Sequence, residues 1–155
     1  MRTLICATLL ALSLGAAPAD PVSWKVEEAP KTVKAGGRFT VRLVAKIQDT
    51  WHLYSMKTME DGPVPTHLVL PDGQPFQLAA AIKGDEPQTM QDPTLKMEVE
   101  LYEGTAGFAL PVKVAANAAP GPQTMVINAT YQSCNNKMCL PPKTVKVEVP
   151  VTVTK

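Results

Sequence analysis

Cysteine is scarce in this chain, and that scarcity restricts the chemistry more than any other feature of its composition. The 155 residues contain three cysteines and two histidines. No phosphate-binding glycine loop and no zinc-ligand spacing is present, so nucleotide binding and a structural zinc site are not indicated. No internal repeat or low-complexity linker divides the chain, and one domain is expected over residues 20–155.

The chain also lacks an excess of either charge. It has 15 Lys and Arg residues against 14 Asp and Glu residues, and loss of Arg2 with an N-terminal leader would make the two numbers equal. Nucleic acids and anionic membrane surfaces favour proteins with a basic face. Neither is therefore expected as a partner.

Long apolar runs are absent outside the N-terminus. Arg2 precedes the apolar stretch 4–14, and Ala17-Pro18-Ala19 fits a cleavage site, so residues 1–19 are predicted to be a signal peptide. No other stretch approaches ~20 apolar residues, and insertion into a membrane is not expected. The mature protein is predicted to be exported to an oxidising compartment, the periplasm. Cys6 lies within the leader, which leaves Cys134 and Cys139 as the cysteine pair.

Apolar and polar residues alternate along much of the mature region, and no window shows helical periodicity. An alternation of period two predicts half-buried antiparallel strands, and Pro and Gly clusters separate these segments. Roughly seven to nine short strands predict an all-β protein, an immunoglobulin-like antiparallel β-sandwich. The clearest alternating segments are 38–47, 97–101, 125–131 and 145–153.

Cys134 and Cys139 enclose the four residues Asn135-Asn136-Lys137-Met138. Because Asn favours turns, the two cysteines are expected to face each other across the mouth of a hairpin, within bridging reach. A disulfide over so short a loop stabilises a fold by roughly 2 kcal/mol in the loop-entropy model, and exposed local disulfides are accessible to a partner thiolate. The spacing leaves two interpretations open: a thiol–disulfide exchange site, or an inert bridge in a binding or chaperone-like domain.

Copper binding is a further alternative, because methionine and histidine are ligands for Cu(I). The six methionines after Met1 show no Met-x-Met or His-x-Met clustering, and Met97 and Met125 fall on predicted core faces. Packing explains them better, and no metal or cofactor is expected. The sequence places no acid or serine partner beside His52 or His67, so a hydrolytic site is not indicated. His52 is expected to be a half-buried packing residue beside Trp51.

Several segments resemble one known family. The sequence Tyr131-Gln132-Ser133-Cys134, followed by Cys139-Leu140-Pro141-Pro142, is similar to the active-site hairpin of the N-terminal periplasmic domain of the transmembrane thiol reductant conductor DsbD. Residues 51–55 resemble the aromatic segment beside that family's cysteines. Residues 97–104 and 108–112 resemble the strand pair that follows its cap loop. The similarity extends in order over essentially all of the mature chain.

The resemblance implies an immunoglobulin-like domain that passes electrons by thiol–disulfide exchange, as a component of protein-disulfide reduction. Cys139 would form the mixed disulfide with a partner, and Cys134 would resolve it. A cap over residues 88–96 would shield the pair. The residues that the resemblance places at the partner-binding surface are Trp51, His52, Tyr54, Leu95, Tyr131 and Met138.

This chain departs from the family pattern at the cap and at its C-terminal end. Leu95 stands where the cap is typically aromatic, so weaker shielding is expected. No membrane-spanning segment or thioredoxin-like domain follows Lys155, so the electron donor is expected to act in trans. The expected partners are thioredoxin-like redox proteins and a membrane electron conductor, and the expected state is a monomer.

Overall fold

The computed structural model describes residues 19–155, which form thirteen β-strands and no helix. The prediction of an all-β protein is therefore confirmed for this part of the chain. Within the same residues, no helix has the length and apolar character needed to cross a membrane. The predicted signal peptide, residues 1–19, falls almost entirely outside the described residues.

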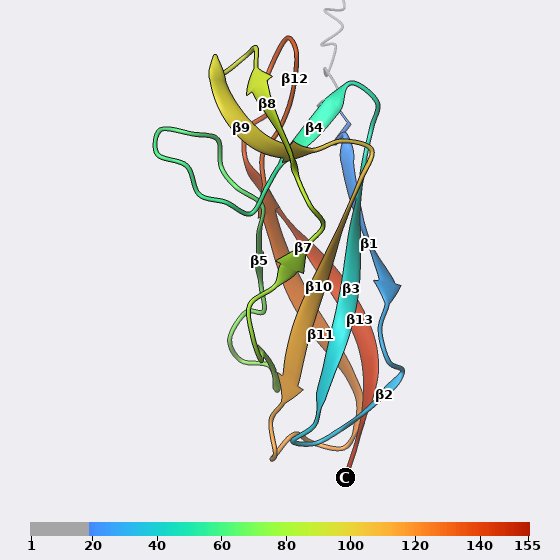
Figure 1. The fold of residues 1–155 in the computed structure, drawn as a ribbon. Helices are drawn as coiled ribbons and strands as arrows, with labels where there is room; N and C mark the ends of the chain where they lie inside the picture. Colours follow the sequence, from blue (N-terminus) through green and yellow to red (C-terminus); the bar gives the residue numbers. More distant parts are fainter. Residues whose placement is uncertain (1–18) are drawn as a thin grey trace, which may run out of the picture.

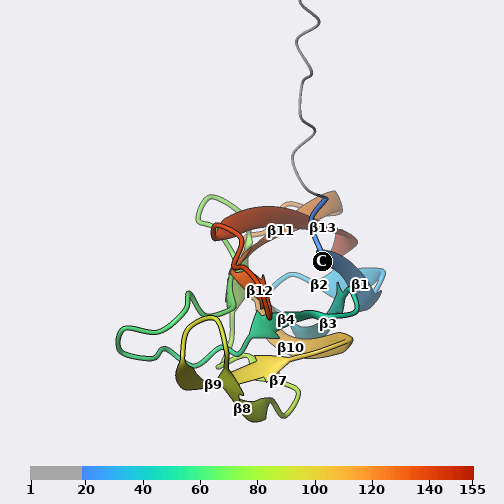
Figure 2. The same cartoon turned by 90° about the horizontal axis from the view of Figure 1, so that it is seen from above.

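Two sheets form a sandwich (Figures 1 and 2). The first has the order β1-β3-β10-β6, with β7 also paired to β10, and the second has the order β2-β13-β11-β5. Within each sheet all neighbours are antiparallel except β2 and β13, which run parallel. The first sheet comprises β1 Val22–Glu28, β3 Arg38–Ile47, β6 Phe76–Leu78, β7 Lys83–Gly84 and β10 Thr105–Val114. The second comprises β2 Thr32–Lys34, β5 His67–Val69, β11 Gly121–Tyr131 and β13 Lys143–Thr154.

The alternating segments of the sequence build the main core between these sheets. In β13 the buried positions are Val147, Val149, Val151 and Val153, while the residues between them are exposed. Adjacent side chains of a strand point to opposite faces, so each alternating segment contributes one apolar face. The strand predictions over 38–47, 125–131 and 145–153 are confirmed by β3, β11 and β13.

A third sheet lies at one end of the sandwich, opposite the end at which the C-terminus lies (Figure 1). Its order is β12-β4-β9-β8. One face of this small sheet packs against the main core through Leu53 and Tyr102, which are opposite each other in the register. The cysteine pair lies at its other face, with Tyr54, Val99 and Leu101. The strands are β4 Trp51–Tyr54, β8 Gln88–Asp92, β9 Met97–Tyr102 and β12 Ser133–Asn135.

Two details of the strand prediction were wrong. The strands are more numerous than predicted, because the third sheet adds four short ones. Residues 83–96 are the longest stretch in which apolar and polar residues do not alternate, so no strand is predicted there, yet they contain β7 and β8. Strand β8 lies at a sheet edge, and four of its five residues are exposed. A strand that is exposed on both faces over most of its length has no reason to alternate, so the sequence gives no period-two signal there.

The chain changes sheets immediately before the first cysteine. The pairing of β11 with β13 ends at Tyr131 opposite Lys143, and β12 then pairs with β4. Pro141 and Pro142 lack backbone N–H donors, so the hairpin ladder cannot continue through them. Gln132 anchors the crossing point: its amide donates to the Leu140 carbonyl, and its carbonyl oxygen accepts from the Val64 N–H.

Candidate functional site

The cysteine loop is a tight turn closed by a disulfide. Cys134 and Cys139 are bonded, with their Cα atoms 4.0 Å apart. The Asn135 carboxamide oxygen accepts hydrogen bonds from the backbone N–H groups of Lys137 and Met138, each at 2.9 Å. The Asn135 N–H donates to the Met138 carbonyl at 2.9 Å. The side chain of Asn thus supplies the turn, as its residue type predicts.

The two cysteines differ in exposure. Cys134 is 0% exposed, whereas Cys139 is partly exposed. Cys134 lies in a small hydrophobic cluster with Tyr54, Val99 and Leu101, and Cys139 packs against the edge of that cluster. A thiolate from a partner must approach a sulfur along an open path. Of the two cysteines, Cys139 is the one that is open to solvent.

Strand β4 brings two polar side chains to the same face as the disulfide. His52 lies directly opposite Cys134 in the antiparallel pairing of β4 with β12, and directly opposed residues share a face of the sheet. Tyr54 follows two residues later on that face, and its hydroxyl is 4.0 Å from the Cys139 Sγ. Both side chains are nearly inaccessible, with exposures of 3% for His52 and 2% for Tyr54.

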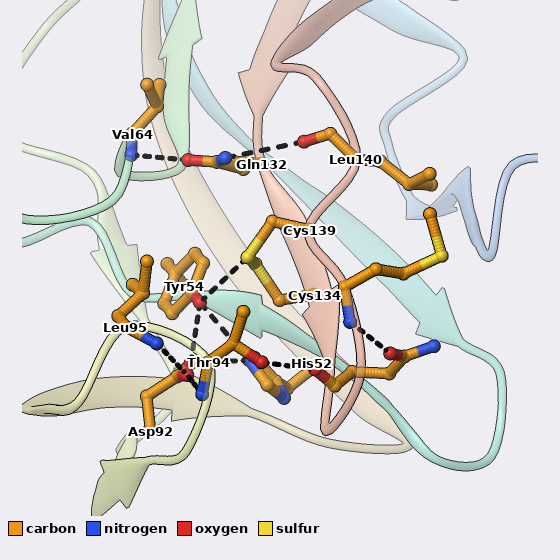
Figure 3. Close-up of a disulfide and its surroundings, with 12 residues drawn as sticks. His52, Tyr54, Val64, Asp92, Thr94, Leu95, Gln132, Cys134, Cys139 and Leu140 are labelled. Atoms are coloured by element: carbon orange, nitrogen blue, oxygen red, sulfur yellow. Dashed lines mark hydrogen bonds and ion pairs between the residues drawn. A yellow bond between two sulfur atoms is a disulfide. The ribbon is translucent and has the colours of Figure 1, made fainter.

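A buried carboxylate joins these side chains. Asp92, at the end of β8, is 1% exposed. Its Oδ2 accepts a hydrogen bond from the Tyr54 hydroxyl at 2.7 Å and lies 3.0 Å from His52 Nε2. Its Oδ1 accepts from the backbone N–H groups of Thr94 and Leu95, at 2.8 and 2.9 Å. Figure 3 shows His52, Tyr54 and Asp92 gathered beside the disulfide.

These contacts set the protonation of Asp92 and Tyr54. Burial alone would raise the pKa of Asp92, but hydrogen bonds from Tyr54, Leu95 and Thr94 outweigh it, and the pKa lies below its ordinary value. Burial, together with the hydrogen bond to Asp92, raises the pKa of Tyr54. At neutral pH the site therefore contains a carboxylate and a neutral phenol that donates to it.

The loop 93–96, between β8 and β9, lies against the cysteine cluster and the cysteine turn. Leu95 packs against the cluster that contains Cys134. The Thr94 hydroxyl donates to the Asn135 carbonyl at 2.9 Å, which ties this loop to the cysteine turn. The backbone reverses at Lys96, whose φ of 57° is left-handed, and the Lys96 N–H donates to the Asp92 carbonyl. Asp92 thus fixes both the loop and the polar side chains beneath it.

Four of the six residues expected at the partner surface lie near the disulfide. Tyr54, His52 and Leu95 surround it, and Met138, at the tip of the turn, is 48% exposed. Trp51 does not join them, because alternation along β4 turns its side chain toward the main core, against which it packs. The expectations that Trp51 lines the site and that His52 is only a half-buried packing residue do not fit this geometry.

Tyr131 also lies elsewhere. It is 1% exposed, belongs to the main core, and packs against Trp24 with ring centroids 5.6 Å apart. Its hydroxyl donates to the carboxylate of Asp20. Tyr131 has the same parity along β11 as Met125, so alternation alone places it on the core face.

Sequence reasoning missed Asp92 as the partner of His52 and the segment 55–66 as a neighbour of the site. Asp92-Pro93 is a turn signal in the sequence, but a partner forty positions from His52 has no local signature. The segment 55–66 projects from the body of the domain between β4 and β5 (Figures 1 and 2). It supplies Met59 to the cysteine cluster and the Val64 N–H that bonds to Gln132.

The structure indicates no metal site among the residues that it describes. Among residues 19–155, no group of three or more His, Cys, Asp or Glu side chains is arranged to hold one. Met125 is fully buried in the main core, and Met97 packs against the cysteine cluster. Packing accounts for these two methionines, as predicted.

Comparisons with known proteins agree with this architecture. Among solved structures, the N-terminal domain of Neisseria meningitidis DsbD in the reduced form superposes with a TM-score of 0.52 at 18% identity, covering 76% of this chain and 82% of that one. The N-terminal periplasmic domain of ScsB from Proteus mirabilis gives a TM-score of 0.52 at 13% identity, covering 84% of this chain and 45% of that one.

The two structural matches establish the fold, which is immunoglobulin-like as predicted. No curated protein sequence matches this chain. The family model described as "Thiol:disulfide interchange protein DsbD, N-terminal" matches residues 22–150, which include both cysteines and all four strands of the small sheet. This chain therefore belongs to the family of the N-terminal domain of the thiol:disulfide interchange protein DsbD.

Proposed function

We propose that this domain carries electrons by thiol–disulfide exchange through Cys134 and Cys139. The observation that supports this most directly is the unequal burial of the two cysteines: Cys134 is 0% exposed, and Cys139, whose sulfur lies 4.0 Å from the Tyr54 hydroxyl, is partly exposed. An exchange site needs one sulfur that a partner reaches and one that is held in reserve. Membership of the DsbD N-terminal family agrees with this assignment.

The exchange proceeds in two steps. When the domain is reduced, the Cys139 thiolate attacks a partner disulfide, forms a mixed disulfide and releases one partner thiolate. The Cys134 thiolate then attacks Cys139 Sγ, which closes the internal disulfide and releases the second partner thiolate. The partner gains two electrons and the domain loses two. The same steps in reverse reduce the domain.

We further propose that the partners are thioredoxin-like redox proteins and a membrane electron conductor, which act in trans in the periplasm. The exposed Met138 beside Cys139 gives a partner an adaptable apolar contact. The half-buried Leu95 limits the approach of small thiols. The roles of Tyr54, His52, Leu95 and Met138 at this surface belong to the same proposal.

An inert disulfide in a binding or chaperone-like domain is the competing function. The two are separated by mixing the oxidised protein with a reduced thioredoxin-like protein, trapping thiols by alkylation and measuring masses. Exchange at Cys134 and Cys139 within minutes is expected. An inert bridge would remain oxidised, and its reduction potential would lie far below about −300 mV.

Matched single-cysteine variants test the assigned roles. Cys134→Ala leaves the accessible thiol without its resolving partner, so a mixed disulfide with the thioredoxin-like protein should accumulate. Cys139→Ala leaves only the sulfur that is 0% exposed, and no mixed disulfide should accumulate. Equal trapping by both variants would contradict the assignment of Cys139 as the contact thiol.

A further inference from the structure

The resolving step poses a proton problem that the burial of Cys134 makes acute. Cys134 reacts as a thiolate, yet its side chain is 0% exposed and lies among Tyr54, Val99 and Leu101. Water cannot reach a fully buried thiol to take its proton, and a thiolate in apolar surroundings is costly. A basic side chain next to Cys134 that accepts the proton would remove this cost.

His52 is placed for this purpose. It is the direct cross-strand neighbour of Cys134, in the pairing of β4 with β12. Directly opposed residues in an antiparallel pair share a face, with Cβ atoms roughly 4.5–5.5 Å apart. The side chains of His52 and Cys134 therefore extend from the same face of the small sheet, the face on which Figure 3 shows the disulfide, Tyr54 and Asp92.

The hydrogen bonds of His52 hold its ring in an orientation that suits a base. Asp92 Oδ2 lies 3.0 Å from Nε2, and the Tyr54 hydroxyl lies 3.3 Å from the same nitrogen. A carboxylate at one ring nitrogen fixes the tautomer with its proton there and stabilises the imidazolium. Both contacts use Nε2, which leaves Nδ1 to accept a proton.

The other side chains around His52 are poorly suited to accept the proton of Cys134. Asp92 faces it from β8 and Tyr54 from its own strand, while β12 contributes Cys134 and the following loop Cys139. On this face β9 contributes the apolar side chains Val99 and Leu101. Asp92 is ionised, but its two oxygens already accept from four hydrogen-bond donors. Tyr54 is one of these donors, so its hydroxyl carries a proton and is not a base. The imidazole is the base that remains.

We propose that His52 accepts the proton of Cys134 when the mixed disulfide is resolved, with Asp92 as its positioning residue. This inference rests on the proposed exchange function. The Cys134 S–H proton passes to His52, the resulting thiolate attacks Cys139 Sγ, and the bond from Cys139 to the partner sulfur breaks. Its electron pair leaves with the partner thiolate. In the reverse direction the His52 imidazolium returns the proton to Cys134 as that sulfur leaves.

A two-phase colour assay separates the two steps. Dithiobis(nitrobenzoate) reacts with the reduced protein and releases one coloured thiolate when Cys139 attacks and a second when Cys134 resolves the mixed disulfide. His52→Gln retains a donor for Asp92 but has no basic nitrogen. General-base assistance typically contributes at least about 100-fold, so the second phase should slow by about that factor at pH 7 while the first is unchanged. The matched control is His67→Gln, which alters an exposed histidine in β5.

The pH dependence of the second phase distinguishes a base from a structural residue. If His52 takes the proton of Cys134, the rate in the unmodified protein should rise by less than tenfold per pH unit below about pH 8. In His52→Gln it should keep rising tenfold per pH unit toward about 8.5, the value at which an unassisted thiol ionises. The profile of the unmodified protein is informative even if the variant does not fold.

Three outcomes would overturn the inference: an unchanged second phase in His52→Gln, equal slowing of both phases, or a rate in the unmodified protein that rises tenfold per unit throughout. Failure of the exchange function itself looks different. In that case the unmodified reduced protein releases no second thiolate, and its internal disulfide does not form.

Discussion

Replacement of Asp92 by alanine perturbs the group that joins the loop 93–96 to the polar side chains beneath it. The carboxylate is 1% exposed, and its removal leaves donors on both sides without an acceptor. These donors are the Tyr54 hydroxyl, His52 Nε2 and the backbone N–H groups of Thr94 and Leu95, at 2.7 to 3.0 Å. Water has little room to replace the carboxylate, because the neighbouring side chains are buried as well.

The expected loss of stability is large for a single substitution. A hydrogen bond to a charged group contributes about 1.5–3 kcal/mol, but contributions to one shared acceptor are not additive. Removing one member of a buried charged network costs about 3–5 kcal/mol. The free energy of unfolding of a whole domain is about 5–15 kcal/mol. Asp92→Ala should therefore lower the melting temperature by about 10–20 °C.

The pH dependence of this loss has a definite sign. The pKa of Asp92 lies below its ordinary value in the folded protein, since its hydrogen bonds outweigh the opposing effect of burial. The stabilisation from its carboxylate is then complete above the unfolded value of about 3.9 and is lost as the pH falls through the folded pKa. The difference between unmodified protein and variant should be largest near neutral pH and shrink in acid.

Urea unfolding at pH 7 and at pH 3, followed by tryptophan fluorescence, measures this difference. Asp72→Ala is the matched control, because it removes an exposed aspartate from a turn far from the cysteines, and it should change the free energy of unfolding by less than about 0.5 kcal/mol. A loss below about 1 kcal/mol for Asp92→Ala at pH 7 would refute the reasoning. So would a loss that grows as the pH falls.

Two further changes test the shielding and the short bridge. Leu95→Ala should speed reduction of the disulfide by glutathione several-fold, since Leu95 packs against the cysteine cluster. The control Leu70→Ala removes the same atoms at the main core and should leave the rate of reduction unchanged. Equal rates of reduction in the two variants would contradict a shielding role for Leu95. Reduction of the disulfide in the unmodified protein should lower the free energy of unfolding by about 2 kcal/mol, as expected for a loop with a sequence separation of 5. Loss of cooperative unfolding on reduction would show that the bridge contributes far more than loop entropy.

The sequence by itself determined the sandwich and the turn. Alternation of valines with polar residues in 145–153 fixed both the strand and its buried face, because side chains of a strand point alternately to its two sides. The residues between the cysteines determined a tight turn in the same local way, since the Asn135 side chain bonds to its own backbone. These features depend only on near neighbours in the chain.

Tertiary structure alone decided the chemistry of the site. Strand β8 is exposed at its first four residues and has no periodic signal, yet its buried last residue, Asp92, contacts His52 and Tyr54 from forty and thirty-eight positions away. The pairing of β4 with β12 places His52 opposite Cys134, and alternation along β4 turns Trp51 away. Contacts of this kind depend on which strands become neighbours, and that is settled by packing of the whole domain rather than by local residue preference.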